Sequence, residues 1–146
     1  MTPDRSDLTL SEVDRRELIG WTTDCVRRLL PIFESAAPDD RRLLDALEGA
    51  AAFARGEMSI GPIRKLAFDC HAAAREIDDS AASAVARACG QAVAVAHMAG
   101  HSREVARYTK KALGADSASE LGWQRAQIPA RFETYVYDDG QITSAR

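Results

Sequence analysis

Two histidines, His97 and His101, stand four residues apart in a stretch with helical periodicity. On a helix this spacing brings both imidazoles to one face, where they could bind zinc. The HExxH pattern is absent because Met98 replaces the glutamate, and Cys89 lies roughly 80° round the helix from His97. Zinc needs three or four ligands. Packing between helices is therefore the favoured interpretation, and a small-molecule or metal site using His71, His97 and His101 is the alternative.

The cysteines give no signal for nucleophilic catalysis. Cys70 and His71 are adjacent, so on a helix they point to different faces and cannot form a thiolate–imidazolium pair. The sequence contains neither a GxSxG nucleophile elbow nor the GxxxxGK[ST] and GxGxxG loops that cradle phosphate. We therefore predict that the protein is not an enzyme and needs no cofactor.

Acidic residues and one tryptophan are the candidate partner contacts. An acidic first turn usually serves as a cap and complements the helix dipole, yet the stretch 34–48 is acidic enough to offer a binding surface as well. Trp123 falls opposite Leu121 on its expected helix, so it either packs between helices or anchors a partner. The candidate contacts are Glu34, Asp39, Asp40, Asp45, Glu48 and Trp123.

Composition bounds the class of protein. The 146 residues are 46% apolar and 28% charged, which is typical of one soluble globular domain. The polar N-terminus predicts no signal peptide, and no apolar run is long enough to span a bilayer. Three cysteines without CxxC spacing favour reduced thiols in a cytoplasm. The net charge of −3 argues against nucleic-acid binding, although residues 1–80 carry −5 and residues 81–146 carry +2.

An alanine-rich stretch at 80–100 organises the chain. Between Ala84 and Gly100 only Arg87, Gln91 and His97 are clearly polar, and a helix that is apolar nearly all round belongs in the interior. Amphipathic stripes at Leu18–Ile32, Leu43–Ala54 and Ile63–Ile77 are expected to pack around it. We predict a single all-α domain of about six helices, with a flexible arm at 1–8 and a frayed tail at 138–146.

Capping and breaking residues predict where these helices begin and end. Starts are expected at Ser11, at the aspartates of 38–40, near Ser59, at 78–80, at Ser102 and near Ser117. Pro31 must kink or end the first helix. Gly56 and Gly114 are expected as terminators, and Pro129 as the start of a final short helix.

Three segments together resemble a known family of bacterial immunity proteins. They are LPIFESAAPDDRRLLDALEGAAAFARGE (30–57), AVAVAHMAGH (92–101) and WQRAQIP (123–129). The combination resembles the all-helical immunity-protein-five-like family, and the similarity runs from about Leu18 to Phe132. The resemblance implies a bacterial protein that binds and neutralises a cognate toxin, and it implies no catalytic residue.

The C-terminal helix also predicts self-association. Its small-residue faces could pair across a two-fold axis, and the aromatics Trp123, Tyr135 and Tyr137 are of the kind enriched at interfaces. We therefore predict a homodimer in which Trp123 is partly buried between subunits.

Overall fold

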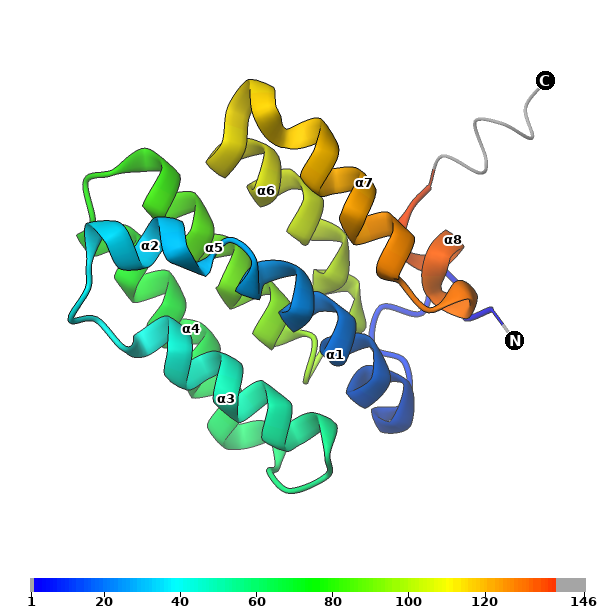
Figure 1. Cartoon of the computed structure of the whole chain (residues 1–146). Coiled ribbons are helices and arrows are strands. Elements are labelled where there is room, and N and C mark those ends of the chain that lie inside the picture. The colour runs from blue at the N-terminus through cyan, green and yellow to red at the C-terminus, as the bar shows by residue number, and fades with distance from the viewer. Residues whose placement is uncertain (1, 139–146) are drawn as a thin grey trace.

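The computed structural model describes residues 2–138 and shows helices throughout, with no strand in that range (Figure 1). The α-helices are α1 (Glu12–Arg27), α2 (Leu30–Ala36), α3 (Arg42–Ala54), α4 (Ile60–Glu76), α5 (Ser80–Ala94), α6 (Val105–Leu113), α7 (Ser117–Gln127) and α8 (Glu133–Val136). Three 3-10 segments, η1 (Ala99–Glu104), η2 (Gly114–Asp116) and η3 (Ala130–Phe132), join the later helices. The predicted all-α class is confirmed. No helix among the described residues has the length and apolarity to cross a membrane.

Helix α5 lies at the centre of the fold and contacts α1, α2, α3, α4, α6 and η1. Ten of its fifteen residues are buried, which is the burial expected of a helix with neighbours on several sides. Its side chains are small, so the neighbours approach closely. At Gly90 a Cβ atom would lie 2.6 Å from His71 Nε2, so the His71 ring of α4 packs directly against the α5 backbone.

The central helix ends at Ala94, earlier than the position near 100 that the sequence predicts. Beyond this end, the N-terminal segment accepts hydrogen bonds from two backbone donors that a longer helix would use internally. The Ala99 N–H donates to the Thr9 carbonyl at 3.3 Å, and the Gly100 N–H donates to the Leu8 carbonyl at 2.9 Å. These bonds replace the helical ones, so the chain passes through a turn into η1.

The first predicted helix is divided in two near Pro31, as that residue's chemistry requires. α1 ends at Arg27, and α2 begins at Leu30 with the proline in its first turn, where its missing N–H costs nothing. Ser11 caps α1 by accepting the Asp14 N–H at 3.2 Å. The division explains why there are more helices than predicted.

Both predicted glycine terminators are confirmed, whereas two predicted caps are wrong. Gly56 and Gly114 adopt positive φ angles of 77° and 60°, which glycine tolerates without a Cβ clash. Helix α3 begins only at Arg42, so Asp40 accepts the Arg42 N–H at 3.0 Å from just before the helix and is not its N-cap. Ser102 is buried within η1, and α6 starts three residues later with no side-chain cap.

The N-terminal segment, expected as a loose arm, is tied to the end of the chain by several hydrogen bonds. Arg5 donates to the carbonyls of Thr134 and Tyr135 at 3.1 and 2.9 Å. Arg103 donates to the carbonyls of Arg5 and Tyr135, and the Tyr135 hydroxyl donates to the Asp7 carbonyl at 2.7 Å. Of the tail expected to fray, residues 139–146 lie outside the described residues.

Candidate functional site

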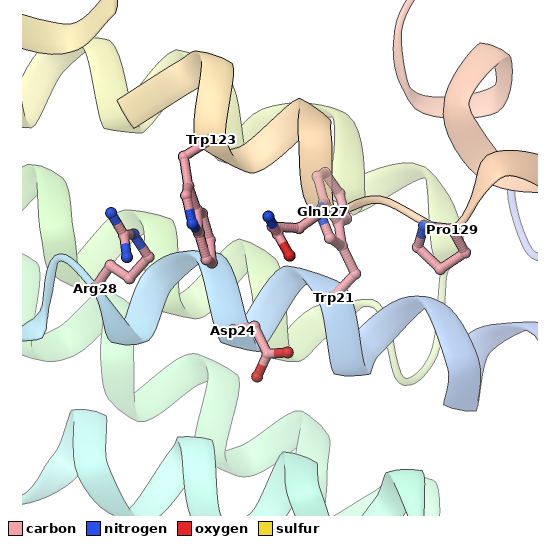
Figure 2. A pocket seen from close by; sticks show the side chains of 6 residues that line it. All are labelled: Trp21, Asp24, Arg28, Trp123, Gln127 and Pro129. Atoms are coloured by element: carbon pink, nitrogen blue, oxygen red, sulfur yellow. The ribbon is translucent and has the colours of Figure 1, made fainter. Parts of the chain in front are cut away.

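A groove between α1 and α7 is lined by two tryptophans, one half-buried and one buried (Figure 2). Its volume is about 440 Å³. The lining residues come from α1 and the residue after it, from α7, and from the turn that follows α7: Trp21, Asp24, Arg28, Trp123, Gln127 and Pro129. We call this site the α1–α7 groove.

Arg28 fixes the position of the more exposed tryptophan. Its guanidinium carbon lies 3.9 Å from the centre of the Trp123 ring, within the range of a cation–π contact. The same guanidinium donates to both carboxylate oxygens of Glu120, at 2.6 and 3.1 Å. Because Glu120 and Trp123 lie on the same helix, Arg28 joins the end of α1 to α7 and holds the indole in place.

The second tryptophan lies deeper and forms the floor of the groove. Trp21 is 5% exposed, and its indole N–H donates to the Gln124 carbonyl at 2.8 Å. Gln124 is itself buried, and its side-chain amide donates to the Thr109 hydroxyl at 2.9 Å. These hydrogen bonds hold the floor of the groove in place and link it through α7 to α6. The groove is therefore formed within the single chain.

Four of the predicted acidic contacts lie exposed on α2, α3 and the loop between them. They are Glu34, Asp39, Asp45 and Glu48. Asp45 pairs weakly with Arg41 at 3.4 Å, whereas no basic residue in the described part of the chain pairs with Glu34, Asp39 or Glu48. None of these carboxylates lines the α1–α7 groove, so Trp123 and the acidic residues form two separate features.

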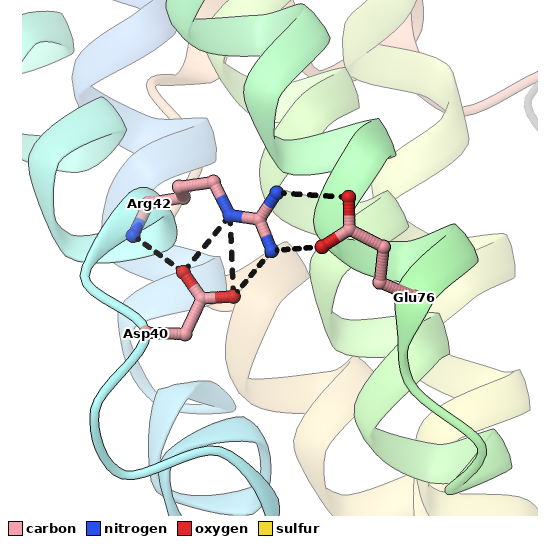
Figure 3. A network of polar contacts seen from close by, with 3 residues as sticks. All are labelled: Asp40, Arg42 and Glu76. Atoms are coloured by element: carbon pink, nitrogen blue, oxygen red, sulfur yellow. Dashed lines mark hydrogen bonds and ion pairs between the residues drawn. The ribbon is translucent and has the colours of Figure 1, made fainter.

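The fifth acidic residue, Asp40, has a structural partner (Figure 3). The Arg42 guanidinium donates to Asp40 Oδ2 at 2.7 Å and to Glu76 Oε1 at 2.8 Å, so it joins the start of α3 to the end of α4. These hydrogen bonds hold the pKa of both carboxyl groups below their ordinary values. Asp40 therefore contributes to joining two helices.

The histidines lie near one another without forming a metal site. The rings of His97 and His101 make an edge contact with centroids 5.2 Å apart, and His101 Nδ1 lies 2.8 Å from Gln91 Oε1. His71 Nδ1 lies 2.9 Å from the Arg87 guanidinium. Burial is the main cause that lowers the pKa of all three imidazoles. The described residues contain no group of three histidine, cysteine or acidic side chains placed to hold a metal ion.

The three cysteines are buried packing groups. Burial raises the pKa of the Cys70 thiol to about 12, and it also raises the pKa values of the Cys25 and Cys89 thiols well above their ordinary value. A thiol that stays protonated at neutral pH is a poor nucleophile. The thiols thus act as small apolar groups in the core.

Comparison with known protein families bears directly on this architecture. The model of the family described as "Imm-5 like putative immunity protein" matches residues 8–131. The chain belongs to this family. Comparisons with curated proteins and with solved structures return no match.

The immunity-protein family match confirms the resemblance seen in the sequence, and it covers the whole α1–α7 groove. The sequence predicts Trp123 as a candidate contact but does not identify Trp21, Asp24 and Arg28 as its neighbours in the groove. Their spacing of three and four residues places them on one face of α1, which was the available signal. The sequence places Trp21 in a buried stripe, which the structure confirms, and only the position of α7 shows that this side chain also lines the groove.

Proposed function

We propose that this protein is an immunity protein that binds a cognate protein toxin and neutralises it without catalysis, with the α1–α7 groove at the centre of the contact. Family membership supports the immunity role. The observation that carries the assignment of the surface is the stacked Arg28–Trp123 pair beside Trp21. Tryptophan and arginine dominate the binding energy of protein interfaces.

The groove is suited to tight binding because its side chains are already ordered. Arg28 is held by Glu120, and Trp21 is held by the Gln124 carbonyl. A partner therefore gains contact area without first having to immobilise these long side chains. The Arg28 guanidinium, whose charge is compensated by the Glu120 carboxylate, offers a planar surface to the partner.

The charge around the groove favours a basic toxin surface. Asp24 is exposed at the groove edge, and no basic side chain among the described residues pairs with it. Glu34, Asp39 and Glu48 are likewise exposed and unpaired within that range. We propose that a lysine or arginine of the toxin reaches Asp24, while the acidic α2–α3 residues accelerate association by long-range attraction.

The first test is protection of bacteria that express the toxin encoded beside this protein. Wild type should restore growth, whereas Trp123→Ala and Arg28→Ala should restore it poorly. The matched control is Phe68→Ala, because Phe68 is 66% exposed on α4, away from the groove. Equal loss of protection in the control, or full protection by both groove variants, would contradict the assigned surface.

The absence of catalysis has its own test. A blocking protein inhibits in proportion to its amount, so toxin activity should fall linearly and reach its minimum at one immunity protein per toxin. Protection at amounts far below the toxin would show turnover and would overturn this part of the proposal.

The homodimer stays a prediction. Within the chain Trp123 is half-buried, partly by Arg28, and the remaining exposed area is available to a second copy or to the toxin. Light scattering at tens of micromolar distinguishes these cases. A monomer leaves the indole free for the toxin, whereas a dimer lost on Trp123→Ala places it between subunits.

A further inference from the structure

A second pocket lies between α5 and α6, formed by residues that do not line the α1–α7 groove. Its volume is about 470 Å³. The lining residues are Ser80, Ser83, Ala84 and Arg87 from α5 with Tyr108 and Lys111 from α6. Two of these side chains are cationic, and none of the described lining residues is acidic.

Arg87 is held in place without neutralisation of its charge. Its guanidinium lies 2.9 Å from His71 Nδ1. Because arginine stays protonated, the imidazole nitrogen must accept this hydrogen bond, so His71 is neutral and carries its proton on Nε2. Burial, followed by the charge of Arg87, lowers the pKa of His71, which agrees with this state. Gly90 leaves the space that the His71 ring occupies.

Several arginines of the chain have their charge met by a carboxylate, whereas, within the described residues, Arg87 does not. Arg28 is bound by Glu120, and Arg131 is bound by Asp14 and Glu17. Arg87 instead has a neutral partner, so its charge remains available to the pocket.

The second cation of the pocket is also without a carboxylate. The Lys111 ammonium lies 5.4 Å from the centre of the Tyr108 ring, and no ion pair involves it in the described part of the chain. Asp79 is the nearest acidic residue along α5, and its carboxylate caps the helix by accepting the Ala82 N–H at 2.9 Å. The pocket therefore combines two uncompensated charges with the Ser80 hydroxyl as a further donor.

We propose that this pocket binds a small phosphate-bearing molecule, with Arg87 and Lys111 as charge-assisted donors to the phosphate oxygens. A doubly charged phosphate matches two cations better than a single carboxylate does. The pocket is larger than a phosphate group, so Ala84 and the Tyr108 ring are left to contact the organic part of the ligand. This role is separate from toxin binding and goes beyond the proposed immunity function.

The proposal is tested by titrating the full-length protein with three probes: inorganic phosphate, phenyl phosphate and benzoate. Backbone amide chemical shifts report where each probe binds. Both phosphates should give saturable shifts in residues 80–87 and 108–111, phenyl phosphate should bind more tightly than phosphate, and benzoate should bind weakly. Lys111→Ala and Arg87→Ala should each weaken phenyl phosphate binding by about tenfold or more.

The matched control is Lys110→Ala, because Lys110 is an exposed neighbour on the same helix that does not line the pocket. It should keep the wild-type affinity. Lys111 is also exposed, so its substitution leaves the fold intact and decides the question even if Arg87→Ala fails to fold. Non-saturable shifts spread over all basic residues, unchanged affinity in Lys111→Ala, or benzoate binding as tightly as phenyl phosphate would each overturn the proposal. Toxin protection by Lys111→Ala should be unimpaired, which separates this test from that of the immunity function.

Discussion

Helices α5 and α7 are both rich in small residues, yet they do different work. α5 buries ten residues against helices on several sides, whereas Gln124 is the one buried residue of α7. Even their glycines differ: a Cβ at Gly90 would collide with the His71 ring, while a Cβ at Gly122 would meet nothing within 4 Å. α5 therefore forms the centre of the core, whereas α7 leaves most of its side chains, Trp123 among them, at or near the surface, as the proposed toxin contact requires.

A charged residue placed on each helix should reveal the difference in burial between α5 and α7 most strongly. Ala92 of α5 is fully buried, so Ala92→Asp should lower the free energy of unfolding by more than about 4 kcal/mol, because the carboxylate would be buried without a partner. Ala118 is exposed in the first turn of α7, where an aspartate complements the helix dipole, so Ala118→Asp should change the free energy of unfolding by less than about 1 kcal/mol. Urea unfolding measures both. A wild-type midpoint for Ala92→Asp would show that α5 is not core.

Alanine substitutions at Gly90 of α5 and Gly122 of α7 should change the stability in opposite directions. Gly90→Ala should lower the free energy of unfolding by about 1–3 kcal/mol, because the His71 ring must move. Gly122→Ala should raise it by about 0.4–1 kcal/mol, because alanine restricts the unfolded chain and has space on α7. Thermal unfolding of the two variants side by side gives the signs. Stability changes of the same sign in both variants would contradict the difference in packing between α5 and α7.

Acidification should weaken the packing around α5. The pKa values of His71, His97 and His101 lie below the ordinary value of 6.5 in the folded protein, chiefly through burial. Below pH 6.5 the unfolded chain therefore binds more protons than the folded one. Stability is fully retained above that pH and declines as the pH falls through it.

Urea unfolding at about pH 7.5 and about pH 5.5 isolates this effect, because carboxyl groups titrate lower. Nearby positive groups add to the downward pKa shifts: Arg87, Arg75 and His101 act on His71, and His101, Arg64 and Arg15 act on His97. Glu104 opposes the shift of His101. The matched variant is His71→Gln, which removes one titrating group and should lose less stability between the two conditions. Equal stability of wild type at both pH values would contradict the predicted direction.

The smallest effects are expected for the partly exposed ion pairs at the start of α3. Arg42→Ala removes the contacts to Asp40 and Glu76. It should lower the free energy of unfolding by about 1 kcal/mol, because these side chains are partly exposed and water weakens the attraction between their charges. Arg41→Ala removes one exposed pair with Asp45 and should change the free energy of unfolding by less than about 0.5 kcal/mol. Salt should reduce the difference between them. A larger loss of stability for Arg41→Ala than for Arg42→Ala would contradict the structural role assigned to Arg42.

Much of the fold could be predicted because local chemistry decides it. Helix ends are fixed by the accepting hydroxyl of Ser11, the ring of Pro31 and the missing side chains of Gly56 and Gly114, and each lies where predicted. The end of α5 could not be predicted in this way. It depends on carbonyls of Leu8 and Thr9, about ninety residues away in the sequence.

The candidate site could be predicted only in part, because it too depends on contacts between residues distant in the sequence. Trp123 stands out by its position relative to Leu121, but its partner Arg28 is identified only when α1 and α7 lie side by side. Asp40 shows the converse. Its position among other acids predicts a surface contact, whereas Asp40 binds Arg42, and the fold brings Glu76 of α4 to the same guanidinium.

The most direct test of the central claim is the affinity of the purified protein for its cognate toxin, measured by calorimetry for wild type, Trp123→Ala and Phe68→Ala. Trp123→Ala should raise the Kd by about thirtyfold or more, as expected of a central aromatic anchor, while keeping the wild-type circular dichroism spectrum. Phe68→Ala should bind as wild type does. A folded Trp123→Ala protein that binds the toxin with wild-type affinity would show that the α1–α7 groove is not the toxin-binding surface.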